Sequence, residues 1–142
     1  MIKQILNGQE KVLKTYTSSF KQIVQGTRIN IPMSQYPLVF IEPLRLTVTG
    51  AAEGGTTGQR YRDFHLFVTL QVWNIYPKAE AWDSSSYSDV LNYCDEVTDA
   101  LANDATLGGT CFYWRVDEIR FNRDYPLRGV EVILDIYARE AI

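Results

Sequence analysis

Residue types that carry catalysis or bind metals are scarce in this sequence. The chain of 142 residues has a single histidine, His65, and two cysteines, Cys94 and Cys111. Nucleophilic catalysis by serine or cysteine generally needs a histidine base close by, and a histidine-based zinc site needs further nitrogen or sulfur ligands. His65 lies in the middle of an alternating strand pattern, where a lone histidine is most often structural. The sequence therefore predicts no catalytic residue, no metal site and no cofactor.

The thiols and the paired carboxylates do not form a reactive set. Cys94 belongs to an apolar helical stripe, where a buried thiol usually acts as a small hydrophobic residue. Cys111 begins a strand near a turn, which leaves its exposure open, but no basic residue adjoins it. Asp117 and Glu118 are adjacent in a strand, so their side chains point to opposite faces and do not make an acid–base pair by themselves. We interpret both thiols as structural.

Two other patterns are weak matches to nucleotide or nucleic-acid sites. The glycine clusters at 50–58 and 108–109 lack the spacing of phosphate-binding loops, so a hairpin tip explains the first better. Phe112, Tyr113 and Trp114 with Arg115 resemble a base-stacking platform. Strand alternation divides those rings between two faces, however, and the formal net charge of -3 opposes a nucleic-acid binder.

The composition indicates a single folded domain over residues 1–142. Hydrophobic residues make up 46% of the chain and aromatic residues 13%, which argues against disorder. An aromatic share this high is typical of proteins that form interfaces. No apolar run approaches the roughly 20 residues that span a bilayer, and the N-terminus lacks the apolar core of a signal peptide. We therefore expect intracellular synthesis and no membrane partner.

The first half of the chain predicts a helix followed by three strands. Apolar residues recur at helical spacing between Ile2 and Val24, and Gly8 weakens the first turns, so we expect a helix over about 9–25. Its lysines, among them Lys14 and Lys21, fall on the opposite side. Strands are expected at 36–41, 44–48 and 64–73, with a flexible hairpin loop at about 50–59.

The second half predicts another helix and two more strands. Ser86 and Asp89 have near-capping-box spacing, so the helix is expected to begin near 84–86. Its apolar stripe comprises Tyr87, Val90, Leu91, Cys94, Val97 and Leu101. The closing strands are expected at 110–121 and 129–139. The predicted fold is α+β, a mixed and mostly antiparallel sheet with two amphipathic helices packed on one face, in the order α-β-β-β-α-β-β.

From about Tyr36 to the C-terminus, this arrangement resembles the tail-terminator (tail-completion, minor tail protein) family of tailed bacteriophages. The resemblance rests on the proline-containing strand at 36–39, the glycine loop leading into strand 64–73, and the serine-opened helix. It continues through the Gly108–Gly109 turn and the closing segment Leu127–Arg139. It implies a non-enzymatic virion protein, made in the host cytoplasm, that caps the tail tube as a homo-oligomeric ring, expected to be a hexamer. The implied partners are the tail tube protein and head–tail connector or stopper proteins, and DNA would pass through the ring without specific binding.

A closed ring needs two different patches on each subunit, and the sequence suggests candidates for them. We expect the hairpin around the glycine loop to contribute, with flanking charges that set the register between subunits. Large rings in predicted loops are either lids on the core or interface anchors. The candidate interface residues are Glu53, Gly54, Gly55, Arg60, Arg62, Trp82, Tyr125, Arg128, Lys14 and Lys21.

Three alternatives stay open at this point. The chain is also compatible with another neck or head-closure position in a tailed phage. A small-molecule enzyme or ligand-binding domain would need a deep pocket near His65, Asp117 or Glu118. An RNA- or single-stranded-DNA-binding module would show salt-dependent binding.

Overall fold

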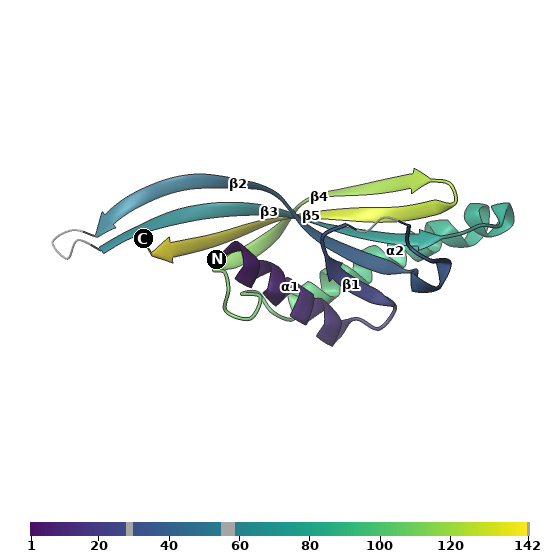
Figure 1. Ribbon diagram of the computed structural model, residues 1–142, viewed down its shortest axis with the longest axis horizontal. Helices are drawn as coiled ribbons and strands as arrows, with labels where there is room; N and C mark the ends of the chain where they lie inside the picture. Colours follow the sequence, from purple (N-terminus) through teal and green to yellow (C-terminus); the bar gives the residue numbers. More distant parts are fainter. Residues whose placement is uncertain (28–29, 55–58, 142) are drawn as a thin grey trace.

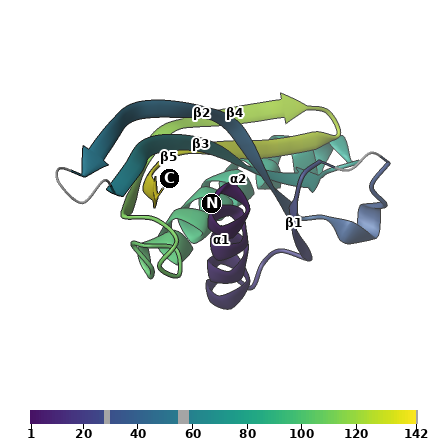
Figure 2. The same ribbon diagram turned by 60° about the vertical axis from the view of Figure 1, so that its left-hand side comes forward.

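The structure is a computed structural model that describes residues 1–27, 30–54 and 59–141, with side chains described for 1–27, 30–48 and 62–140. Two helices lie on one face of a five-stranded mixed sheet with strand order β1-β2-β3-β5-β4 (Figures 1 and 2). The predicted α+β class and the order α-β-β-β-α-β-β are confirmed. The elements are α1 (Ile2–Tyr16), β1 (Gln22–Gln25), the 3-10 turn η1 (Met33–Gln35), β2 (Leu38–Gly54), β3 (Gln59–Ile75), α2 (Ala79–Ala102), β4 (Tyr113–Asp124) and β5 (Leu127–Ala141).

The central strands alternate as their sequences predict. β2 pairs antiparallel with β3, β3 with β5, and β5 with β4, whereas β1 lies parallel to β2. We call the side covered by the helices the helix face; its buried residues on β3 and β5 are Phe64, Leu66, Val68, Leu70, Val72, Val130, Val132, Leu134, Ile136 and Ala138. The opposite side, the helix-free face, carries His65, Phe67, Thr69, Gln71 and Trp73 of β3 and Glu131, Ile133, Asp135, Tyr137 and Arg139 of β5. Successive residues of a strand point to opposite faces, which produces this division.

The first helix is shorter than predicted, because residues 22–25 form β1. α1 ends at Tyr16, and Thr17 is already extended. Ile23 of β1 pairs with Val39 of β2 and is buried. Backbone hydrogen bonding to a neighbouring strand, together with two β-branched residues in a row, outweighs the helical spacing of the apolar positions.

The segment between α1 and β1 is held by α2. The Glu96 carboxylate accepts hydrogen bonds from the backbone N–H groups of Ser18 and Ser19, at 2.9 and 3.1 Å. Burial raises the pKa of Glu96 and these bonds lower it more, so the net pKa lies below its usual value. The ring of Phe20 contacts that of Tyr93, with centroids 5.5 Å apart. The chain is thus turned toward the sheet at the point where the predicted helix would have continued.

Gly8 lies inside α1 rather than before it. A Cβ built at this position would lie 2.3 Å from the carbonyl oxygen of Leu107 and 3.1 Å from Oγ1 of Thr110. Glycine therefore permits the helix backbone to touch the segment that joins α2 to β4. This close approach explains why a residue of low helix propensity stands in the middle of a helix.

The second helix begins earlier than predicted and without a side-chain cap. Its N-cap is Lys78, and no side chain bonds the free N–H groups there. The predicted Ser86–Asp89 box is wrong because both residues lie well inside the helix. Ser86 donates to the carbonyl of Trp82, and Asp89 accepts from the Tyr76 hydroxyl at 2.8 Å. Asp89 thereby ties α2 to the end of β3.

The two strands predicted at 36–41 and 44–48 are one long strand, β2. Irregularities in its register with β3 lie between Pro43 and Arg45 and between Val48 and Gly50. The predicted loop at 50–59 is shorter, because Gly50–Gly54 and Gln59 belong to strands. Residues 55–58 lie outside the described residues. In the described part of the chain, neither helix has the length and hydropathy needed to cross a membrane.

Gln9 is a polar residue in the middle of the core. Its side chain is fully buried, and among the described residues neither its amide oxygen nor its amide nitrogen has a hydrogen-bond partner. Unpaired polar atoms keep their desolvation cost, so we expect Gln9→Leu to raise the free energy of unfolding by about 1 to 2 kcal/mol. Urea denaturation followed by circular dichroism measures this, with exposed Gln4→Leu as the control. A loss of stability in Gln9→Leu would show that this amide is hydrogen-bonded in solution.

Candidate assembly surfaces

One end of the sheet projects past the helices (Figure 1). We call this projection the arm and define it as residues 44–54 of β2 and 59–64 of β3, flanked by 138–141 of β5. Charged pairs join its strands: Arg139 donates to Asp63 at 2.6 and 3.3 Å, and Arg62 lies 3.5 Å from Glu140. The Arg139 guanidinium lowers the pKa of Asp63. The arm is therefore held together by cross-strand ion pairs in addition to backbone hydrogen bonds.

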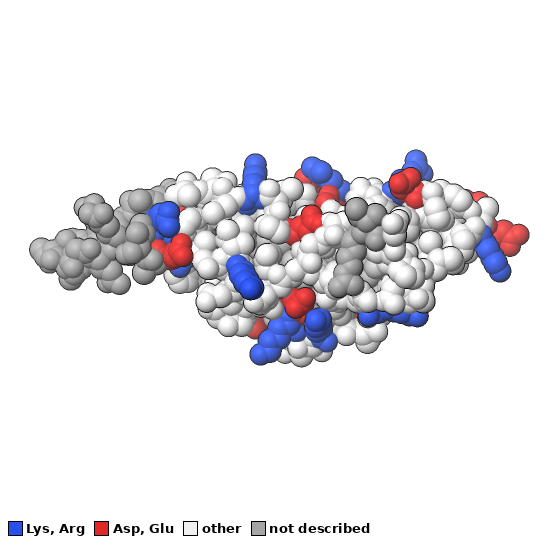
Figure 3. Space-filling view, viewed as in Figure 1, with Lys and Arg blue, Asp and Glu red and all other residues white. Residues whose placement is uncertain are grey.

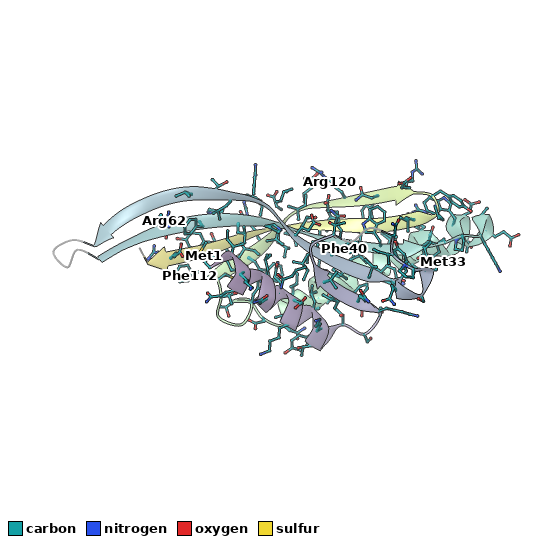
Figure 4. All side chains as sticks on the ribbon, viewed as in Figure 1. Met1, Met33, Phe40, Arg62, Phe112 and Arg120 are labelled. Carbon is teal, nitrogen blue, oxygen red and sulfur yellow. The ribbon has the colours of Figure 1, made fainter. Side chains whose placement is uncertain are left out.

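Four of the predicted interface residues fall in the arm, and a fifth lies beyond its described part. Arg62 (labelled in Figure 4) lies with its guanidinium carbon 5.4 Å from the centre of the Phe64 ring. The backbones of Glu53 and Arg60 pair directly, and Gly54 pairs with Gln59. Gly55 lies outside the described residues. The prediction that this hairpin contacts a neighbour stays a prediction.

The arm exposes aliphatic side chains that the sequence assigned to a half-buried strand. Leu46 and Val48 point to the helix face, opposite Leu66 and Phe64, but they are not covered as their partners on β3 are. They are 40% and 53% exposed. Alternation alone correctly predicted their direction and not their exposure, because nothing in a strand pattern tells where the covering helix stops.

Three predicted interface residues meet at the other end of the molecule. Trp82 of α2 and Tyr125 of the β4–β5 turn make an edge-to-face contact, with ring centroids 5.4 Å apart. The guanidinium of Arg128 lies 5.4 Å from the Trp82 ring centre and 5.6 Å from that of Tyr87, and it donates to Ser86 Oγ at 2.9 Å. The prediction that Trp82 lies in a loop is wrong, since it is helical. We call Trp82, Tyr87, Tyr125 and Arg128 the aromatic–arginine cluster.

An apolar cleft of about 190 Å³ adjoins this cluster between α2 and β4. It is lined by Tyr87, Val90, Leu91, Phe121 and Arg128. Tyr87 and Leu91 were predicted to face the core, but both are exposed, because the stripe of α2 is wider than the part of the sheet beneath it. Phe121 was missed altogether; its only signal was alternation within β4.

The two predicted lysines line one cleft although only one of them is helical. Lys14 is in the last turn of α1, where it lies 3.7 Å from Glu10, and Lys21 precedes β1. A cleft of about 380 Å³ between them is lined also by Thr17, Phe20 and Ile23. The two lysines predicted on one helix thus lie in the last turn of α1 and in the segment that leads into β1.

The lone histidine takes part in a buried polar group on the helix-free face. Asp135 is only 2% exposed, and its two carboxylate oxygens bond His65 Nδ1 at 2.7 Å and Arg115 Nε at 3.1 Å. The Tyr137 ring lies beside that of His65, with centroids 5.3 Å apart. The charges of Asp135 and Arg115 are therefore paired within the sheet, and His65 bonds the same carboxylate, as expected for a structural histidine. Sequence reasoning missed Asp135, whose strand register with His65 was not known.

The thiols are both buried, which also answers the question that the sequence left open for Cys111. Burial raises the pKa of Cys111 to about 11, with a further contribution from the Asp104 carboxylate. Burial and the nearby Asp95 likewise raise the pKa of Cys94. A thiol with a raised pKa is protonated at neutral pH and is a poor nucleophile or metal ligand.

Within the described part of the chain, no group of three or more His, Cys, Asp or Glu residues is arranged to hold a metal ion. Two further clefts, of about 300 and 320 Å³, lie near Thr110 and near Asn122. His65, Asp117 and Glu118 line none of the four clefts described here. On the face drawn in Figure 3, basic and acidic side chains are interspersed over the described surface. A wide surface of one sign, as nucleic-acid binders present, is not seen on that face.

No protein-family model matches the sequence, and no curated protein is significantly similar to it. Among solved structures, the chain is similar to the sheath/tube terminator, in its extended state, of the extracellular contractile injection system PVC. The TM-score is 0.53 at 13% identity, and the alignment covers 99% of this chain and 58% of that one. A chain from the virion of a native gene transfer agent aligns over 98% of this chain and 92% of its own length, with 8% identity and a TM-score of 0.37, which is too low to carry an argument. The chain spans little more than half of the terminator's length. Over its own length it has a similar fold. The resemblance that the sequence suggested is therefore confirmed at the level of the fold.

Proposed function

We propose that this chain is a structural protein of a tailed phage or phage-like particle that closes the end of the tail tube as a ring of identical subunits. The observation that carries the proposal is the similarity of fold, along 99% of the chain, to a sheath/tube terminator. The element order of the sequence resembles the same class of protein. Two independent comparisons thus favour the same class of protein.

The exposed surfaces support a role in assembly. The arm and the aromatic–arginine cluster lie at opposite ends of the elongated molecule (Figure 1). Both expose large apolar side chains, which in isolated soluble domains are usually covered. Patches of this kind suit contacts with other copies of the chain or with partner proteins. In this proposal the partners are other copies of the chain, with a hexamer expected, the tail tube protein, and a connector or stopper protein.

The proposal places the protein in the neck or tail of the virion, with DNA passing through the ring unbound. The interspersed charges and the formal net charge of -3 favour passage over tight binding, which depends on the release of many counterions. No observation on the described residues favours an enzyme over a structural protein. Another neck position remains the nearest alternative, and the tube protein distinguishes it from a terminator.

Electron microscopy with the cognate tube protein tests the proposal. We expect the purified chain to form rings, or to form them on tube ends, and to stop further tube growth when added during polymerisation. Light scattering after size-exclusion chromatography gives the subunit number. A chain that stays monomeric at high concentration and does not bind tube ends would contradict the proposal. Rings that bind a connector protein and not the tube would identify another neck component.

A further inference from the structure

Two strand edges in the described part of the chain lack a backbone partner. β4 is the last strand on one side of the sheet. On the other side, β1 covers β2 only from Leu38 to Ile41, which leaves Glu42–Gly54 without a neighbour. An uncovered edge presents N–H and C=O groups that are ready to pair with another chain.

The topology fixes how these two edges would meet between copies. β2 and β5 run in one direction and β3 and β4 in the other. A second copy can be placed next to β4 in the same orientation, with its helix face on the same side of the sheet. Its β2 then lies beside β4 of the first copy and runs antiparallel to it. We propose that copies of this chain associate by pairing Glu42–Val48 of one copy with Trp114–Arg120 of the next, so that the sheet continues from subunit to subunit. This inference rests on the proposed function and specifies the contact between ring subunits.

Charges on the helix-free face select the register of this pairing. We call residues that pair side by side across β2, β3, β5 and β4 a row. Glu42 and Glu118 lie in one row, and Arg45 and Arg115 lie in the next row on this face. Direct alignment would thus oppose like charges. A displacement of one row, which is two residues, places Glu42 against Arg120 and Arg45 against Glu118. Opposite charges facing each other across neighbouring strands are stabilising, and like charges are destabilising.

Three of these four charged side chains, Arg45, Glu118 and Arg120, are exposed, and Glu42 is half-buried. Arg120 points away from the helices (Figure 4) and is 57% exposed, and Glu118 is 46% exposed. Within one chain Arg120 and Glu118 bond each other at 2.8 Å, and Arg120 also lies 3.8 Å from Glu131, so the contact would exchange these partners for those of the neighbouring copy. The guanidinium of Arg45 lies 4.1 Å from the Phe67 ring centre, so it is already directed along the face.

The helix face of the same two edges is apolar and uncovered. Leu46 and Val48 of β2 are exposed, and Val116 and Ile119 of β4 are 38% and 39% exposed. In the displaced register these aliphatic residues form one continuous strip across the contact. Hydrophobic contact on one face and charge pairing on the other distinguish this contact from indiscriminate edge pairing.

Charge reversal tests the pairing. Glu42→Arg alone places two arginines at the contact, and Arg120→Glu alone places two glutamates there. We expect each to raise the dissociation constant of the oligomer at least tenfold by light scattering and analytical ultracentrifugation. The double variant in one chain restores opposite charges at every contact. An equimolar mixture of the two single variants does so when they alternate around a ring with an even number of subunits, such as the expected hexamer, and both should restore assembly. Thermal melting of each monomer checks that it is folded, and the matched control Asp95→Arg, on the exposed side of α2, should assemble normally.

The outcomes separate this inference from the proposed function. If the wild type assembles and the single variants assemble equally well, the edge pairing is wrong while the ring remains. If the single variants fail and neither the double variant nor the mixture recovers, the charge register is wrong and the inference is overturned. A wild type that forms no oligomer, alone or on tubes, overturns the proposed function and this contact with it.

Discussion

Asp135→Ala is expected to lower the free energy of unfolding by about 3 kcal/mol. The carboxylate is almost fully buried on the helix-free face and accepts charge-assisted hydrogen bonds from His65 and Arg115. Its removal deletes both bonds and leaves a small void among packed side chains. Arg115 is mostly exposed and regains water, which keeps the loss below that of a fully buried cation. Chemical denaturation at pH 7 measures the change.

The control for this experiment is Asp117→Ala. Asp117 is an exposed carboxylate on β4, two residues from Arg115. Because exposed charges contribute little, its removal should change stability by less than about 0.5 kcal/mol. Equal effects of the two substitutions would mean that the contacts of Asp135 are not formed in solution.

Gly8→Ala is expected to destabilise the protein by about 2 kcal/mol, although alanine is the better helix former. At an exposed helix position, glycine to alanine would gain about 1 kcal/mol. Here the new methyl group would lie 2.3 Å from the Leu107 carbonyl oxygen, a backbone atom that moves only if the α2–β4 connection moves. The steric cost therefore exceeds the gain in propensity. Thermal and urea melts of the monomer measure the difference.

Gln4→Ala in the same helix is the matched control, because Gln4 is exposed. It should be neutral or slightly stabilising. If Gly8→Ala also stabilised the chain, α1 would not be packed against the α2–β4 connection as described. Gly8→Ser would then be tolerated as well.

The strands with strict alternation were predictable because their periodicity comes directly from burial. In residues 64–73 and 130–138 every second residue is apolar and buried, and the structure places these strands at the centre of the sheet. A period of two has no helical interpretation, so no other element competes for these residues. The fold class followed from these strands and from the stripe of α2.

Residues 20–24 show where sequence reasoning failed. Phe20, Ile23 and Val24 continue the apolar spacing of α1, so periodicity alone extends the helix through them. Residues 22–25 form a strand because residues 38–41, which are distant in the sequence, pair with them through backbone hydrogen bonds. The predicted start of α2 is wrong for a related reason. Ser86, predicted as a cap, lies inside the helix, where its hydroxyl donates to the Trp82 carbonyl and accepts from Arg128.

The candidate surfaces were predictable only in part. The sequence predicts Trp82 and Tyr125 as aromatic rings in loops and does not indicate that they meet Arg128, yet the Trp82 ring contacts both of the others. Leu46 and Phe121 were not chosen, because strand spacing assigns a face and does not reveal whether a helix covers it. Exposure depends on the length of α2 relative to the sheet, which is a property of the assembled domain.

The layered construction, with helices on one side of the sheet only, has a consequence for any closed assembly. Subunits related by rotation about one axis all turn the same side toward that axis. If the sheet continues from subunit to subunit as proposed, a ring of this protein would have a wall of bare strands on one surface and a belt of helices on the other. The two surfaces would differ in chemistry without any further device, since Arg115, Glu118 and Arg120 repeat on one and the lysines of α1 on the other. The proposed edge pairing thus gives a cylinder with unlike inner and outer walls.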